Sequence, residues 1–65
     1  NDRPAIVFAE LSEVRSEPQK AGSPVILLHE GAKVYVIETV GKWKKIELTD
    51  GQEGWIDAST IKEVK

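Results

Sequence analysis

Short apolar runs, each closed by a turn signal, leave this sequence no segment long enough for an amphipathic helix. The main runs span residues 5–9, 25–28, 33–38, 43–48 and 53–56, with weaker ones at 10–17 and 61–64. The Asp50–Gly51 pair is the strongest short hairpin signal in the chain. Residues 57–60 are expected to form one 3₁₀ turn. The pattern predicts an all-β domain, a small barrel or sandwich of five or six short antiparallel strands with this turn before the last strand.

The length of 65 residues permits one domain with a small core. The chain has no cysteine, which excludes a disulfide framework and a thiolate metal site, so apolar packing has to supply the stability. Residues 1–4 are polar and end in a proline, and we expect them to be a linker or terminal tail before a barrel domain at 5–65. The absence of methionine suggests a segment of a longer protein.

Charge and hydropathy argue against several classes of partner. Nine basic and eleven acidic residues give a net charge of −2, spread along the chain, which disfavours nucleic acid and anionic membranes. Lysines flank Trp43, but acidic residues lie near them in sequence, as on a solvated strand. No apolar run approaches the roughly 20 residues that cross a bilayer, so no direct membrane insertion is expected. His29 is the only histidine, which argues against a transition-metal site, and no cofactor is expected.

Four pieces of sequence, at residues 14–18, 28–36, 41–46 and 51–56, occur in an order that resembles the bacterial SH3 domain family. They follow the family patterns V-R-x-x-P, L-x-x-G-x-x-V-x-V, G-x-W-x-K-V and G-x-x-G-W-V. The resemblance covers nearly the whole chain and implies an SH3-like barrel. In such a barrel Gly31 and Gly51 would take positive φ angles at turns. The residues expected to face the core are Val34, Val36, Ile46, Leu48 and Ile56.

Residues 28–34, together with the opening run at 5–9, are also similar to the C-terminal module of tetratricopeptide-repeat proteins from Bacteroides aerotolerance (Bat) operons. This likeness implies a host protein that is associated with the membrane or cell envelope of a bacterium. It also implies that the module makes protein contacts.

Eukaryotic SH3 domains bind proline-rich peptides in an aromatic groove, and the corresponding positions here are more polar. Asp57 stands where that groove has a proline, and Thr60 where it has a tyrosine, so polyproline recognition is not expected. Trp43 lies three residues before Ile46, which leaves the indole partly exposed in a regular strand or turned into the barrel wall by a bulge. The candidate ligand-binding residues are Trp43, Glu17, Asp57 and Thr60, with the loop at residues 15–24.

These features predict a non-catalytic module that docks a protein or peptide, because a barrel of this size has little volume for a catalytic site. The alternative is binding of peptidoglycan, with Glu17 and Asp57 pairing with amino groups of a stem peptide, and a third hypothesis is a structural cap without a ligand. We expect the isolated domain to be a monomer.

The apolar run at residues 25–28 points to both faces of a strand. We expect Ile6 and Phe8 to cover the outer face, the other interpretation being an exposed apolar patch.

Overall fold

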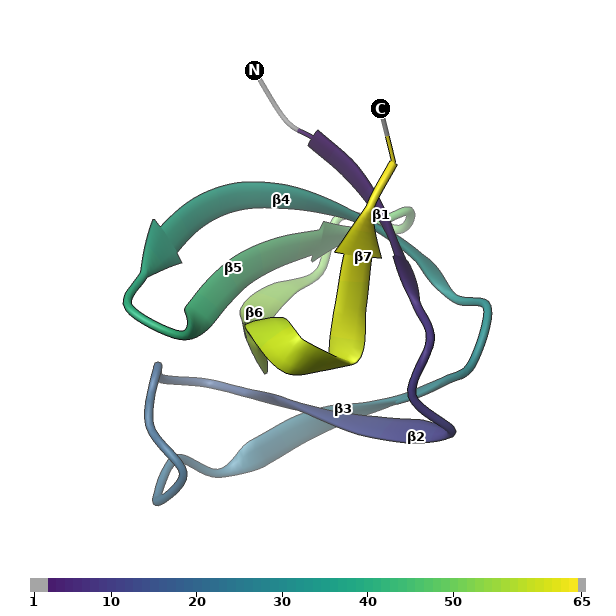
Figure 1. The fold of residues 1–65 in the computed structure, drawn as a ribbon. Coiled ribbons are helices and arrows are strands. Elements are labelled where there is room, and N and C mark those ends of the chain that lie inside the picture. The colour runs from purple at the N-terminus through teal and green to yellow at the C-terminus, as the bar shows by residue number, and fades with distance from the viewer. Residues whose placement is uncertain (1–2, 65) are drawn as a thin grey trace.

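A computed structural model describes residues 3–64. Its elements are β1 (Arg3–Val7), β2 (Leu11–Arg15), β3 (Pro24–His29), β4 (Lys33–Val40), β5 (Trp43–Leu48), β6 (Glu53–Asp57), the 3₁₀ turn η1 (Ala58–Thr60) and β7 (Ile61–Glu63) (Figure 1). The all-β prediction and the 3₁₀ turn before the last strand are confirmed. Within residues 3–64 there are seven strands where five or six were expected, because the two weaker runs, at 10–17 and 61–64, each form a strand as the main runs do.

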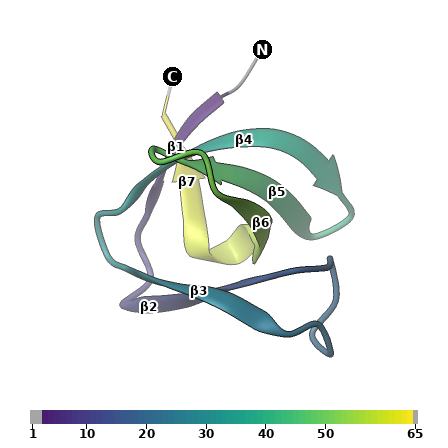
Figure 2. The ribbon, with the colours of Figure 1, turned by 180° about the vertical axis from the view of Figure 1, so that it is seen from behind.

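In the described part of the chain, seven strands form one antiparallel sheet in the order β3-β2-β6-β5-β4-β1-β7. The sheet curls on itself, so that the β2–β3 hairpin passes beneath η1 in both views (Figures 1 and 2). β2 meets β6 through a single pair, Arg15 opposite Trp55. Beyond that pair the two strands diverge, and this divergence opens the space described below as the candidate site.

The first strand begins earlier than the sequence predicts. Arg3 and Pro4, expected in a terminal tail, pair with Val36 and Tyr35 of β4. The Pro4 carbonyl also accepts a hydrogen bond from Val64 N at 2.8 Å. The local proline signal is therefore overridden by pairing with strands that are distant in sequence. The other two residues of the expected tail, 1 and 2, lie outside the described residues.

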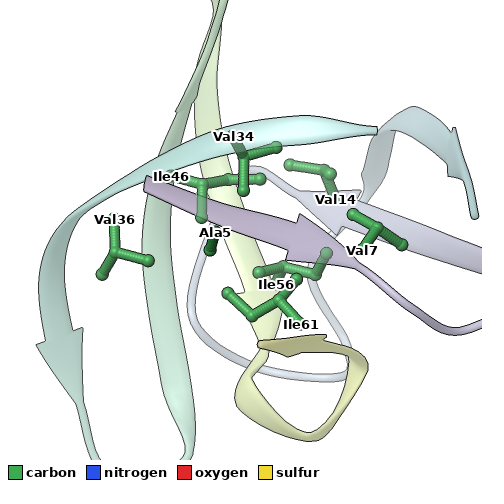
Figure 3. Packing of buried hydrophobic residues seen from close by; sticks show 8 residues of the cluster. All are labelled: Ala5, Val7, Val14, Val34, Val36, Ile46, Ile56 and Ile61. Atoms are coloured by element: carbon green, nitrogen blue, oxygen red, sulfur yellow. The ribbon is translucent and has the colours of Figure 1, made fainter. Parts of the chain in front are cut away.

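Among the residues that the structure describes, eight small or branched side chains from six strands form the core (Figure 3). They are Ala5, Val7, Val14, Val34, Val36, Ile46, Ile56 and Ile61. Within β4 and β6 buried residues alternate with more exposed ones, as expected for strands with one face on the core. Four of the five predicted core residues are buried, and the fifth, Leu48, is partly buried against the cluster.

Three glycines show why this residue type is needed. Gly51 has a φ of 92° in the β5–β6 turn, where its N–H donates to Leu48 O at 3.0 Å. The predicted positive φ at Gly31 is also found. Gly54 has a different role, because a Cβ atom there would collide with Val14 Cγ1 and lie 3.1 Å from Arg15 O. Gly54 thus allows β6 to approach β2 closely.

Within residues 3–64 no helix has the length and apolar character needed to cross a membrane.

Candidate functional site

A groove of about 570 Å³ lies between the β2–β3 hairpin and the elements that carry Trp43, Asp57 and Thr60. The hairpin side contributes Leu11, Glu13, Arg15 and Leu27, and Lys20 comes from the hairpin loop. The opposite side is formed by the start of β5, the end of β6 and the last residue of η1. The groove thus combines aliphatic, aromatic and charged side chains from segments far apart in sequence.

Trp43 is half-buried and lies outside the core cluster. It is the first residue of β5 and pairs with Val40 on one side and Asp57 on the other. Ile46, an odd number of positions later, is fully buried, so the two side chains are on opposite faces of the strand. The irregularity in this part of the sheet falls in β4, between Val36 and Glu38, rather than at Trp43. Of the two interpretations of the indole, the structure therefore favours the partly exposed one.

Asp57 is fixed by the turn that follows it. Its Oδ1 atom accepts hydrogen bonds from Ser59 N at 2.9 Å and from Ser59 Oγ at 2.8 Å. These two bonds, and the positive charges of Lys42 and Lys20, lower the pKa of the Asp57 carboxyl and keep it ionised at neutral pH. Both bonds use Oδ1, so within residues 3–64 Oδ2 has no hydrogen-bond partner and is free to accept one from a ligand.

Hydrogen bonds hold Thr60 and η1 against the neighbouring segments. Thr60 Oγ1 donates to Asp57 O at 2.8 Å, and Ala58 N donates to Lys42 O at 2.8 Å. The second bond joins the 3₁₀ turn to the β4–β5 turn, directly before Trp43. The relative positions of Trp43, Asp57 and Thr60 are thus set by backbone pairing and by local hydrogen bonds.

The long loop at residues 16–23 closes on itself and on β2. Arg15 Nη1 donates to Gly22 O at 2.7 Å, and Ser16 N donates to Ser23 O at 3.1 Å. The loop places Lys20 at the groove. Glu17, the remaining predicted site residue, does not line the groove, and its carboxylate accepts a hydrogen bond from Gln19 Nε2 at 2.8 Å. Three of the four predicted residues therefore share one groove, and Glu17 lies in a loop beside it.

Sequence reasoning missed the aliphatic wall of the groove. Leu11 and Leu27 are 54% and 53% exposed and lie on the hairpin. The expected cover by Ile6 and Phe8 is wrong, because β1 pairs with β4 and β7, and Phe8 is itself 56% exposed. The apolar run at residues 25–28 did indicate this wall, since the other interpretation of that run was an exposed apolar patch.

A second cavity, of about 390 Å³, lies beside the β5–β6 turn. Its one carboxylate, Asp50, accepts hydrogen bonds from Gln52 N at 3.0 Å and from Gln52 Nε2 at 2.6 Å, which lower its pKa. The bonds of Asp50 stabilise its own turn, so this cavity has no free carboxylate oxygen of the kind Asp57 offers. Within residues 3–64, no three histidine or acidic side chains are grouped closely enough to hold a metal ion.

Comparison with known families matches residues 10–62 to the model described as the bacterial SH3 domain. The match includes β2, the hairpin loop, Trp43 and η1, and so covers every residue of the groove. Domains of this family are generally binding modules without catalytic activity, often related to the cell wall or found in envelope-associated proteins. No curated protein matches the sequence significantly.

Proposed function

The chain belongs to the bacterial SH3 domain family, and we propose that it is a non-catalytic docking module that binds an extended segment of a protein or peptide partner. The observation that carries the proposal is the convergence of Trp43, Asp57 and Thr60 with two half-exposed leucines in one groove. Aromatic and aliphatic side chains beside a few oriented polar groups are typical of peptide-binding grooves.

Each wall of the groove suits a different part of such a ligand. Leu11 and Leu27 would pack against an apolar side chain, and the Trp43 indole would cover its other side. Asp57 Oδ2 would accept a hydrogen bond from a ligand donor, and Lys20 would pair with a ligand acid. Because Asp57 and Thr60 hold the positions of the polyproline-binding residues, we propose that proline-rich segments are not the ligand.

The setting of the module follows from resemblance. We propose a bacterial envelope-associated host, and more specifically a tetratricopeptide-repeat protein of a Bacteroides aerotolerance operon, whose repeats would bind other partners. The support for the specific host is the similarity of residues 28–34 and 5–9.

The test uses a peptide selected against the domain from a random displayed library. When this peptide binds, we expect the amide chemical shifts of the domain to change around Trp43, Asp57 and Leu27. Trp43→Ala should weaken binding about 30-fold, since a buried aromatic anchor contributes on the order of 2 kcal/mol. The matched control is Phe8→Ala, which removes an exposed aromatic ring outside the groove and should leave affinity unchanged.

Two results would contradict the proposal. Loss of folding in Trp43→Ala, seen as a collapsed amide spectrum, would show that the indole is a core residue and has no free face for a ligand. Equal weakening by Phe8→Ala, or shifts away from the groove, would place binding elsewhere on the domain.

The alternative is that the groove binds a peptidoglycan stem peptide. It is favoured by the ionised carboxylate of Asp57, whose Oδ2 atom has no hydrogen-bond partner within residues 3–64. An amino group of the stem peptide would pair with Oδ2. Titration with soluble peptidoglycan fragments should then give saturable shifts at Trp43, Asp57 and Thr60, which Asp57→Asn would weaken. A silent spectrum at millimolar fragment would leave the protein or peptide partner as the ligand.

A further inference from the structure

Within residues 3–64, four charged side chains line the groove: Glu13, Arg15, Lys20 and Asp57. Two of them neutralise each other, because Arg15 Nη2 lies 2.5 Å from Glu13 Oε1. The Nη1 atom of the same guanidinium donates to Gly22 O at 2.7 Å. The Arg15 side chain is only 19% exposed, so its charge is used inside the domain and little of it is accessible to a ligand.

Lys20 is the other cation of the groove, and its charge is free. The side chain is exposed, and none of the salt bridges found within the described range includes its ammonium group. Glu17, the nearest acid along the chain, accepts a hydrogen bond from Gln19 Nε2 at 2.8 Å instead. A lysine that lines a groove without an acidic partner can pair with an acid of the ligand.

Backbone hydrogen bonds on both sides of Lys20 hold it at the groove. Ser16 N donates to Ser23 O at 3.1 Å, which closes the loop at its base. Gly22 N donates to Gln19 O at 3.0 Å, which closes a turn around Lys20 itself. The backbone position of Lys20 is thus set before a ligand arrives, and only the side chain has to become ordered on binding.

A second lysine lies at the same end of the groove. Lys42 is exposed in the turn between β4 and β5, and this turn and the hairpin loop lie at the same end of the molecule in both views (Figures 1 and 2). The charges that act on the Asp57 carboxyl and help to lower its pKa are those of Lys42 and Lys20, and both are positive. Two lysines against one carboxylate give this end of the groove an excess of positive charge, although the whole chain has a net charge of −2.

Away from the loop, the hairpin wall of the groove is apolar. Leu11 and Leu27 are both more than half exposed, and Leu27 lies opposite Glu13 in the ladder. The wall therefore runs from the leucines past Arg15 to Lys20. The strand positions from Leu11 to Arg15 span roughly 13 Å at about 3.3 Å per residue. An extended ligand of about four or five residues has the same length, with every second side chain on one face.

We propose that the groove selects an extended peptide segment in which an acidic residue lies two to four positions from an apolar residue. The apolar side chain packs between the two leucines and the Trp43 indole, and the ligand carboxylate pairs with the Lys20 ammonium. Lys42 adds attraction from the neighbouring turn. This inference rests on the proposed function and narrows its class of ligand.

Charge complementarity favours an acid over a base at this place. A basic ligand residue would meet both lysines, and only the second carboxylate oxygen of Asp57 would offset them. That oxygen accepts a backbone N–H of the ligand, which requires no charge. Because the ion pair at Lys20 is exposed, we expect its removal to weaken binding about threefold to fivefold.

The experiment is selection of a random displayed heptapeptide library on the 65-residue chain and on Lys20→Glu, both at low salt. Peptides bound by the wild type should be enriched in Asp or Glu two to four positions from an apolar residue. Lys20→Glu should lose this enrichment and favour Lys or Arg at the same place. The matched control is Lys62→Glu, which makes the same charge change at an exposed site on β7 outside the groove and should select the wild-type pattern.

A selected peptide and its variant, in which an amide replaces the acid, then form a double-mutant cycle with Lys20→Gln. Either change alone should weaken binding about threefold to fivefold, and the second change should add little to the first. The difference between wild type and Lys20→Gln should disappear near 1 M salt, where the screening length is about 3 Å. Amide chemical shifts measure the affinities and show that each variant is folded.

Peptides that bind the groove without a preference for acids would overturn this inference and leave the proposed function standing. The same holds for additive effects in the cycle, for a preference for basic residues, and for an equal change of selection in Lys62→Glu, which would trace the effect to net charge. If no selected peptide shifts the amides around Trp43 and Leu27, the proposed function fails, and this inference fails with it.

Discussion

The β6 strand approaches β2 closely at Gly54 because glycine has no side chain. We expect Gly54→Ala to lower the free energy of unfolding by about 1–3 kcal/mol, the usual cost of an added methyl group in a packed site. The physical reason is the collision of the new Cβ with Val14 Cγ1 and its close contact with Arg15 O. Urea unfolding followed by tryptophan fluorescence measures the change.

The matched control is a double-mutant cycle with Val14→Ala, which removes the atom that the new methyl group would meet. The double variant should be less destabilised than the sum of the two single variants, because the alanine methyl group takes up part of the space left by the valine. Strict additivity of the two changes would show that the effect comes from the Arg15 backbone or from strand conformation instead.

For single residues, the orientation of a side chain could be inferred from sequence where it depends on one physical rule, such as the alternation of faces along a strand. The odd separation of Trp43 and Ile46 left two interpretations open, opposite faces of a regular strand or a bulge that turns Trp43 into the barrel wall, and the structure favours the first. Glu17 was proposed from its place in a long loop, but loop composition does not determine where a side chain points. Its hydrogen bond with Gln19 depends on a loop conformation that the pattern of residues did not contain.

Among the elements, the best-predicted ones are those with local signals. The bounds of β5 were predicted correctly, because Gly41 precedes the strand and the Asp50–Gly51 pair follows it. The start of β1 and the neighbours of β3 were wrong, since both depend on strand order in the sheet. Strand pairs distant in sequence set that order, and no residue pattern in β1 distinguishes β4 from β3 as its neighbour.

The last strand, β7, is held by charges as well as by its short ladder. The Glu63 carboxylate pairs with Lys44 of β5, and Glu63 Oε1 lies 3.4 Å from Arg3 Nε of β1. The hydrogen bond from Lys44, followed by the two positive charges, lowers the pKa of Glu63. This carboxylate therefore links the end of the chain to two other strands.

We expect Glu63→Gln to loosen β7 locally, because the amide has no charge for either cation. Hydrogen exchange should be faster at Val64 N, whose bond to Pro4 O closes the end of the ladder, while exchange in β5 stays unchanged. Lys62→Gln is the control, as it alters an exposed charge on the same strand. If exchange rises equally in both variants, strand propensity rather than the ion pairs is responsible.

On the scale of the whole molecule, the fold has no disulfide and relies on a core of eight small or branched side chains. Domains of this size are marginally stable, so a few polar contacts form a large part of the net free energy of unfolding. Among residues 3–64, three carboxyls have a lowered pKa in the folded state, and in each the leading cause is a hydrogen bond. They are Asp50, Asp57 and Glu63, which lie in a turn, at η1 and in β7.

Stability should therefore fall in acid. A carboxyl with a lower pKa in the folded than in the unfolded state stabilises the fold above its unfolded pKa, which is 3.8 for Asp and 4.5 for Glu. As pH falls through these values toward the folded pKa, the unfolded chain binds more protons and the stabilisation is lost. We expect the urea midpoint to be level above about pH 5 and to decline steadily below it.

A triple variant tests whether these three carboxyls cause the loss of stability in acid. Its changes are Asp50→Asn, Asp57→Asn and Glu63→Gln. The two asparagines keep an oxygen that can accept the bonds from Gln52 and Ser59, so the turns retain their acceptors while the titrating groups are removed. The triple variant should be less stable at neutral pH and should show a flatter dependence of the urea midpoint on pH. An unchanged slope would mean that other carboxyls, or general charge repulsion in acid, control the loss of stability.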